Sequence, residues 1–224
     1  QIEQKMRRVN VILGGTREQM DSLRRQVIAL SRETPHSADA LAEGLQKIVE
    51  LGERNPDRAL ALLREAARGA TVTGQQLIPV VEQLDSILDN FEGRKAPEVL
   101  DLLAKAGTQG APIGDITRLV AELAPRAAAA RVPLEDLVAT VTTLLQTLSP
   151  QQAMLALRAG FSGLTVDAQN ADAKLNQLGG TIEIVNGRLV LGGRFAEAHR
   201  QTLQGLAGAA GTAARQEAEL NGSL

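Results

Sequence analysis

Residues that end helices recur along this chain at intervals of about a dozen positions. Gly, Pro and the capping residues Ser, Thr and Asn divide the 224 residues into about ten short segments. One unbroken helix of this length would extend over about 340 Å at about 1.5 Å per residue. Helices of a dozen residues are only marginally stable alone, so the breaks predict a compact fold in which short helices pack together.

The composition agrees with a mostly helical chain and excludes several kinds of site. Ala and Leu, with 34 and 33 copies, both enter helices at little cost. The chain has 24 Lys and Arg against 26 Asp and Glu, without the basic excess of a dedicated nucleic-acid binder. With no Cys, Trp or Tyr and two His, it cannot form a disulfide framework, a thiolate or multi-histidine zinc site, or an aromatic stacking platform.

Local signals predict where the helices begin and end. Thr16 with Gln19, and Ser149 with Gln152, have the spacing of a capping box, and Asn55 before Pro56 has the pattern of a helix start. Thr73 with Gln76 repeats the capping-box spacing, whereas Pro79 and Pro125 predict kinks inside their helices. The expected helices cover residues 2–13, 16–34, 37–51, 55–69, 73–91, 97–107, 116–130, 133–145, 149–161, 166–178 and 194–206, with a loop over 108–114.

One segment near the C-terminus has the period of a strand. Residues 181–185 and 188–191 are rich in β-branched and apolar side chains, and they flank Asn186-Gly187. A type I′ turn needs positive φ at both central residues, so Asn-Gly between two such runs predicts a β-hairpin. Two strands are marginal alone, so we expect the hairpin to lean on helices. The predicted fold is therefore mainly α, with about ten short helices and one small hairpin.

The positions of the helix-ending residues also predict a domain organisation. We expect an N-terminal lead-in over residues 1–34 and a helical domain over 35–206, followed by a weakly ordered tail over 207–224. The helical domain would have two loose lobes, 35–95 and 96–164, and then a helix and the hairpin over 165–206. No fixed period connects the lobes, which argues against a regular solenoid. Gln1 at the start suggests a fragment or a processed piece.

No catalytic, cofactor-binding or metal site is predicted. The phosphate-loop, dinucleotide, zinc-protease and serine-elbow motifs are all missing. His36 and His199 are interpreted as structural or solvated, and the pairs Glu135/Asp136 and Asp85/Asp89 as solvated or helix-start charges. Acidic neighbours dilute Arg7-Arg8 below a nucleic-acid patch, and the apolar runs fall short of the roughly 18 residues of a membrane span.

The order of parts in Ile116 to Leu164 resembles the tape measure proteins of long-tailed bacteriophages. A helix with a Pro and small residues is followed by a Leu-rich helix and an A-x-x-A-L-R helix, here 124–130, 132–145 and 153–158. The resemblance covers roughly residues 35–206, including a helix and an extended piece at 175–187. The family commonly has Gly where this chain has Arg131, and a Gly at the end of the Leu-rich helix, where this chain has Thr147 and then Leu148-Ser149-Pro150.

The resemblance implies a structural, non-enzymatic role. The parent protein would determine tail length during assembly and leave with the DNA at infection, and this segment would be a compact module of it. Implied partners are tail tube, distal tail and assembly chaperone proteins, with three or six copies in the tail lumen or tip, after assembly in the host cytoplasm. The alternatives are a cellular helical scaffold that binds partner helices in its grooves, and, less well supported, a wall-degrading enzyme.

Overall fold

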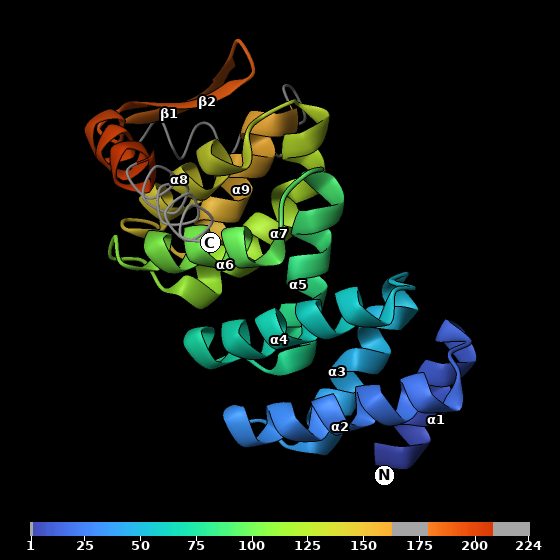
Figure 1. Ribbon diagram of the computed structural model, residues 1–224. Helices are drawn as coiled ribbons and strands as arrows, with labels where there is room; N and C mark the ends of the chain where they lie inside the picture. Colours follow the sequence, from blue (N-terminus) through green and yellow to red (C-terminus); the bar gives the residue numbers. More distant parts are fainter. Residues whose placement is uncertain (1, 163–178, 208–224) are drawn as a thin grey trace, which may run out of the picture. The chain divides into compact units, whose positions relative to one another are not determined.

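The computed structural model describes residues 2–162 and 179–207 of this chain, and within them it is mainly helical (Figure 1). The prediction of about ten short helices and one C-terminal hairpin is confirmed. The helix expected over 166–178 and the tail after 207 lie outside the described residues. The elements are α1 (Ile2–Leu13), α2 (Arg17–Glu33), α3 (Ala38–Leu51), α4 (Pro56–Thr73), α5 (Leu77–Asn90), α6 (Ala96–Gly107), α7 (Ile113–Ala129), α8 (Leu134–Leu145), α9 (Pro150–Ser162), β1 (Gly180–Val185), β2 (Arg188–Gly193) and a last helix at residues 196–207.

Most helices begin where the sequence signals place them. In the capping box before α2, the Gln19 N–H donates to Thr16 Oγ1 at 3.2 Å, and the Thr16 N–H donates to the Gln19 side chain at 2.9 Å. Ser149 and Gln152 exchange the same two bonds before α9, at 3.3 and 3.1 Å. These caps use backbone groups that a helix end leaves without an intrahelical partner, so they fix the boundary locally.

The predicted end of the fourth helix and the predicted start of the fifth are wrong. The helix α4 continues through Gly69 to Thr73 and ends at Gly74, which has a φ of +68°. A Cβ on Gly69 would lie 2.9 Å from a Leu100 methyl carbon and 3.1 Å from a Val80 methyl carbon. This glycine therefore permits close packing inside a helix. Thr73 is the last residue of α4, so its hydroxyl does not cap α5.

The two internal prolines are accommodated differently. Pro79 is the third residue of α5, where a helix has no partner for a backbone N–H, so it needs no kink there. Pro125 lies inside α7, which continues past it to Ala129. The same helix begins at Ile113, so the loop before it is shorter than the predicted 108–114.

The helix α7 ends in a hydrogen-bond pattern typical of a glycine-terminated helix, but with an arginine in the key position. The Val132 N–H donates to the Ala127 carbonyl at 2.8 Å, and the Arg131 N–H donates to the Ala128 carbonyl at 3.0 Å. This is the Schellman pattern, which needs a left-handed residue at its turn. Arg131 supplies it with a φ of +57°, so the turn forms without a glycine.

The described residues divide into two compact units. Unit 1 comprises residues 2–89 and 93–100, and unit 2 comprises residues 90–92, 101–162 and 179–207, so the division falls inside α6. In unit 1, α3 packs against α1, α2 and α4. In unit 2, α7 packs against α8 and α9, and nearly all of α8 is buried. Both cores are built from Leu, Val, Ile and many Ala, which let the helix backbones approach closely.

The hairpin is confirmed in its place and its turn. β1 pairs antiparallel with β2, with Val185 opposite Arg188. Asn186 and Gly187 have φ values of +52° and +73°, as a type I′ turn requires. β1 packs against α9 and β2 against α8, so the two strands lie over these helices (Figure 1). The hairpin therefore depends on the helices of unit 2 for its stability.

Candidate interaction surface

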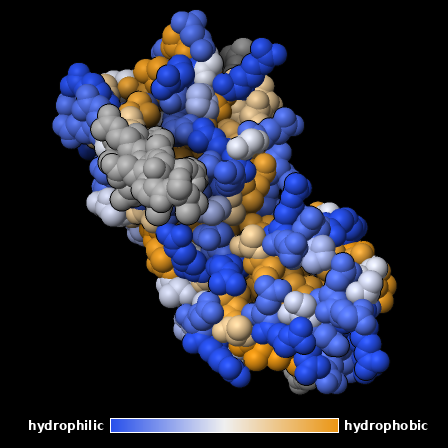
Figure 2. All heavy atoms as spheres, in the orientation of Figure 1, coloured by the Kyte–Doolittle hydropathy of each residue, from blue (hydrophilic) through white to orange (hydrophobic). Residues whose placement is uncertain are grey.

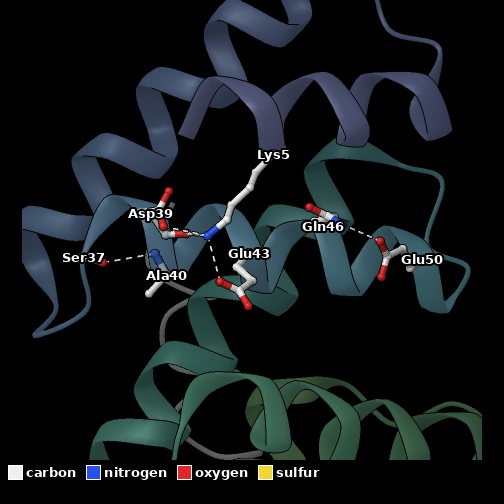
Figure 3. A network of polar contacts seen from close by, with 7 residues as sticks. All are labelled: Lys5, Ser37, Asp39, Ala40, Glu43, Gln46 and Glu50. Carbon is white, nitrogen blue, oxygen red and sulfur yellow. Dashed lines mark hydrogen bonds and ion pairs between the residues drawn. The ribbon is translucent and has the colours of Figure 1, made fainter. Parts of the chain in front are cut away.

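In unit 1, a charged tether fixes α1 on α3 (Figure 3). Lys5 Nζ lies 2.7 Å from Asp39 Oδ2 and 2.8 Å from Glu43 Oε2, and it also donates to the Asp39 carbonyl at 3.2 Å. Partial burial lowers the pKa of Lys5, but the hydrogen bonds to the two carboxylates outweigh this and raise it overall. The ammonium therefore stays charged and uses all three of its donors, which suits a structural anchor.

In unit 2, a buried carboxylate clasps the hairpin to α8. Asp136 is 1% exposed. Its oxygens accept hydrogen bonds from Arg188 Nε at 2.5 Å and Arg188 Nη2 at 2.7 Å, and the Leu189 N–H donates at 3.2 Å. Three donors from β2 thus meet one side chain in the first turn of α8, which fixes the position and the register of the strand.

His199 joins the same polar cluster from the last helix. Thr140 lies one turn after Asp136, and its hydroxyl donates to the Asp136 carbonyl at 2.7 Å. The hydroxyl proton is thereby used, so His199 Nε2, at 3.1 Å from Thr140 Oγ1, is the donor in that contact. Burial lowers the pKa of His199, Asp136 opposes this, and Arg188 adds to the lowering. The imidazole is therefore a neutral hydrogen-bond donor within the packed core.

His36 has a separate structural setting in unit 1. Its Nε2 lies 3.1 Å from the Ala67 carbonyl and 3.3 Å from Thr71 Oγ1. It thus ties the loop before α3 to α4. The two histidines lie in different units and bind different partners. In residues 2–162 and 179–207, no group of three or more His, Asp or Glu side chains is placed to hold a metal ion.

The predicted setting of the carboxylates is correct in part. The sequence predicts a solvated or a helix-start charge at Asp136, and this residue does lie in the first turn of α8. It is buried rather than solvated, because β2 covers it and supplies three donors. Asp85 is partly buried in α5, and this burial, followed by repulsion from Asp89, raises its pKa to about 6, while Lys47 opposes the shift. Sequence reasoning missed the role of Asp136 because its partner, Arg188, lies 52 residues away.

The hairpin also exposes apolar surface. Val185 is 46% and Val190 42% exposed, and Figure 2 shows hydrophobic side chains along this ribbon among hydrophilic ones. On the opposite face Leu189 and Leu191 are each 2% exposed. Across the part of the chain that the structure describes, no helix combines the length and the apolar character of a membrane span. The hairpin thus has one buried face and one exposed face, and the bonds from Arg188 and Leu189 to Asp136 hold it against α8.

These features define the class of protein: a helical module whose short helices pack through small apolar side chains. Comparison with known proteins places it more closely. The family model of the phage-related minor tail protein matches residues 24–220, and the chain belongs to that family. It is also 24% identical over 198 residues to the tape measure protein of Pneumococcus phage Dp-1.

The relative is much longer than this chain. The match covers 85% of this chain and 17% of the Dp-1 protein, so the chain spans about a sixth of that relative's length. No solved structure matches this chain significantly. The resemblance noted in the sequence is thus confirmed at the level of the family, and a structural role in a phage tail follows from it.

Proposed function

We propose that this chain is a compact module of a tape measure protein, in a parent that determines tail length during assembly and is ejected with the DNA. The observation that carries the proposal is the match over 85% of the chain to a protein named for that role. The breaks between the short helices of the described residues support a packed module rather than an extended ruler. Its role would be non-enzymatic and would depend on packing faces, since Asp136 and His199 are engaged in structural bonds.

The same proposal includes partners and placement. The module would contact tail tube, distal tail or assembly chaperone proteins, in three or six copies, within the tail lumen or tip, after assembly in the host cytoplasm. We also propose that the lead-in over 1–34, the lobes 35–95 and 96–164, and the segments 165–206 and 207–224 are its functional subdivisions. A cellular scaffold is the second candidate, and binding of a defined helical peptide by the monomer would favour it.

The test is an in-frame deletion of residues 1–224 from the parent gene, with tail length measured by electron microscopy. A packed module predicts unchanged tail length and lost infectivity. A contribution as extended helix predicts a tail shorter by about 340 Å, at about 1.5 Å per residue, and would contradict the proposal.

A point variant tests whether the fold of the module matters when the number of residues is unchanged. Leu123 in α7 is fully buried, so Leu123→Asp should unfold unit 2 at constant length. We expect normal tails with reduced infectivity. Gln151→Glu, at an exposed position of α9, is the matched control and should leave both properties unchanged.

A further inference from the structure

Two sets of three consecutive helices have the same spacing along the chain. The helix α2 begins at residue 17 and α7 at residue 113, which is 96 positions later, and both have 17 residues. The middle helices, α3 and α8, begin at residues 38 and 134, again 96 positions apart. The third helices, α4 and α9, begin at residues 56 and 150, 94 positions apart, because α8 has 12 residues where α3 has 14. This change of spacing explains why no fixed period is evident in the sequence.

The helices of each set also pack in the same way. In unit 1, α2, α3 and α4 contact one another in all three pairs, and in unit 2, α7, α8 and α9 do the same. Apolar residues that lie 96 positions apart in the middle helices are buried in both units. These pairs are Leu41 and Leu137, Leu45 and Val141, and Ile48 and Leu144. The two sets therefore share core positions as well as the order of their helices.

The third helices share a further local pattern. The side chains of Asn55 and Ser149 accept hydrogen bonds from the first turns of α4 and α9, and a Pro follows each of them. The same two positions in each helix are fully buried. They hold Ala59 and Leu63 in α4, and Ala153 and Leu157 in α9. The next residues, Arg64 and Arg158, each form an ion pair with a glutamate of the first helix in their own set.

A fourth helix contacts the same face of the middle helix in both units. Gly44 in α3 and Thr140 in α8 lie 96 positions apart. A Cβ on Gly44 would lie 2.9 Å from a Leu77 methyl carbon of α5. Thr140 Oγ1 lies 3.1 Å from His199 Nε2 of the last helix.

The next turn of each middle helix repeats this relation. Lys47 Nζ lies 2.7 Å from Glu82 Oε1 of α5. Thr143, 96 positions later, has its Oγ1 3.3 Å from Thr202 Oγ1 of the last helix. The helix α5 in unit 1 and the last helix in unit 2 therefore lie on equivalent faces, although their sequences and contacts differ.

We propose that residues 17–73 and 113–162 are two copies of one three-helix repeat. Each copy is completed by a fourth helix on the same face of its middle helix, α5 in unit 1 and the last helix in unit 2. The hairpin is then an addition to the second copy. This equivalence concerns the fold of the chain and does not depend on its role in a phage tail.

An exchange of equivalent segments within the full 224-residue chain tests the repeat. In one variant residues 55–61 take the sequence of residues 149–155, and in the other residues 149–155 take the sequence of residues 55–61. Each exchange keeps the cap, the Pro and the buried Ala in place, and it replaces Leu60 by Met or Met154 by Leu, which conserves volume. Amide protection in the receiving unit, measured by hydrogen exchange, should fall less than about tenfold.

The matched controls carry the same seven residues one position later, at 56–62 and 150–156. They replace the fully buried Ala59 by Gln and Ala153 by Arg, so protection should fall at least about a hundredfold. A small loss in both exchanges with a larger loss in both controls supports the proposal. An exchange that loses tenfold or more in either unit, or that fails to fold, overturns it. A control that loses no more than its exchange also overturns it.

Discussion

Removal of Arg188 should loosen the hairpin, because it leaves a buried carboxylate without its cation. Asp136 accepts two bonds from Arg188, at 2.5 and 2.7 Å, and its side chain is 2% exposed. Loss of one partner of a buried pair costs about 3–5 kcal/mol. The Arg188 side chain is itself 60% exposed, so water can partly replace it, and we expect about 2–3 kcal/mol for Arg188→Met.

Hydrogen exchange over residues 180–193 measures the cost at the hairpin itself. A local measurement is needed because global unfolding would report on two units together. A loss of about 2–3 kcal/mol corresponds to a roughly 30- to 150-fold fall in amide protection, at about 1.4 kcal/mol per factor of ten. The double variant Asp136→Leu with Arg188→Met should recover most of the protection, because an apolar pair removes the unpaired charge. Arg200→Met, which breaks an exposed pair with Glu197, is the control and should cost under about 0.5 kcal/mol.

The reasoning would be refuted by equal loss in the single and the double variant. In that case the cost would come from lost contacts of the Arg188 chain rather than from the unpaired charge. A change below about 0.5 kcal/mol in Arg188→Met would also refute it, since this is the range of an exposed ion pair.

Three further predictions concern single positions. Arg131→Gly removes the backbone strain of a non-glycine residue with positive φ and should raise the free energy of unfolding by about 0.5–1 kcal/mol in thermal melts. Arg131→Ala keeps that strain and should not raise it. The pKa of His199 is lowered, mainly through burial, so its contribution to folding stability is complete above pH 6.5 and is lost as the pH falls below that value. His199→Gln should therefore make the urea midpoint of unfolding less dependent on pH between pH 5 and 8. Asp85, with its pKa raised from 3.8 to about 6, stabilises the fold at low pH and loses this contribution as pH rises through 6. Asp85→Asn should therefore add up to about 1 kcal/mol at pH 8, allowing for solvent screening, and little at pH 4, as urea unfolding would show.

The features that could be predicted from sequence are those decided within a few residues. A capping box such as Thr16 with Gln19 satisfies backbone groups three residues apart, and Asn186-Gly187 supplies two positive φ angles by itself. These signals needed no knowledge of the tertiary fold. Gly69 shows the opposite case. As a sequence signal it resembles a helix stop, but the side chains of Val80 and Leu100 decide its role, and they come from other helices.

The contact of Asp136 with Arg188 and Leu189 could not be predicted either, because it too depends on the packing of distant elements. Glu135 and Asp136 are adjacent carboxylates in the first turn of a helix, where either one alone suits the helix dipole. Only the packing of β2 on α8 buries Asp136 and leaves Glu135 outside the core. A pattern search could have noted that Arg188 begins the strand after the turn. It could not have shown which carboxylate this arginine meets, since the choice depends on the crossing of the two elements.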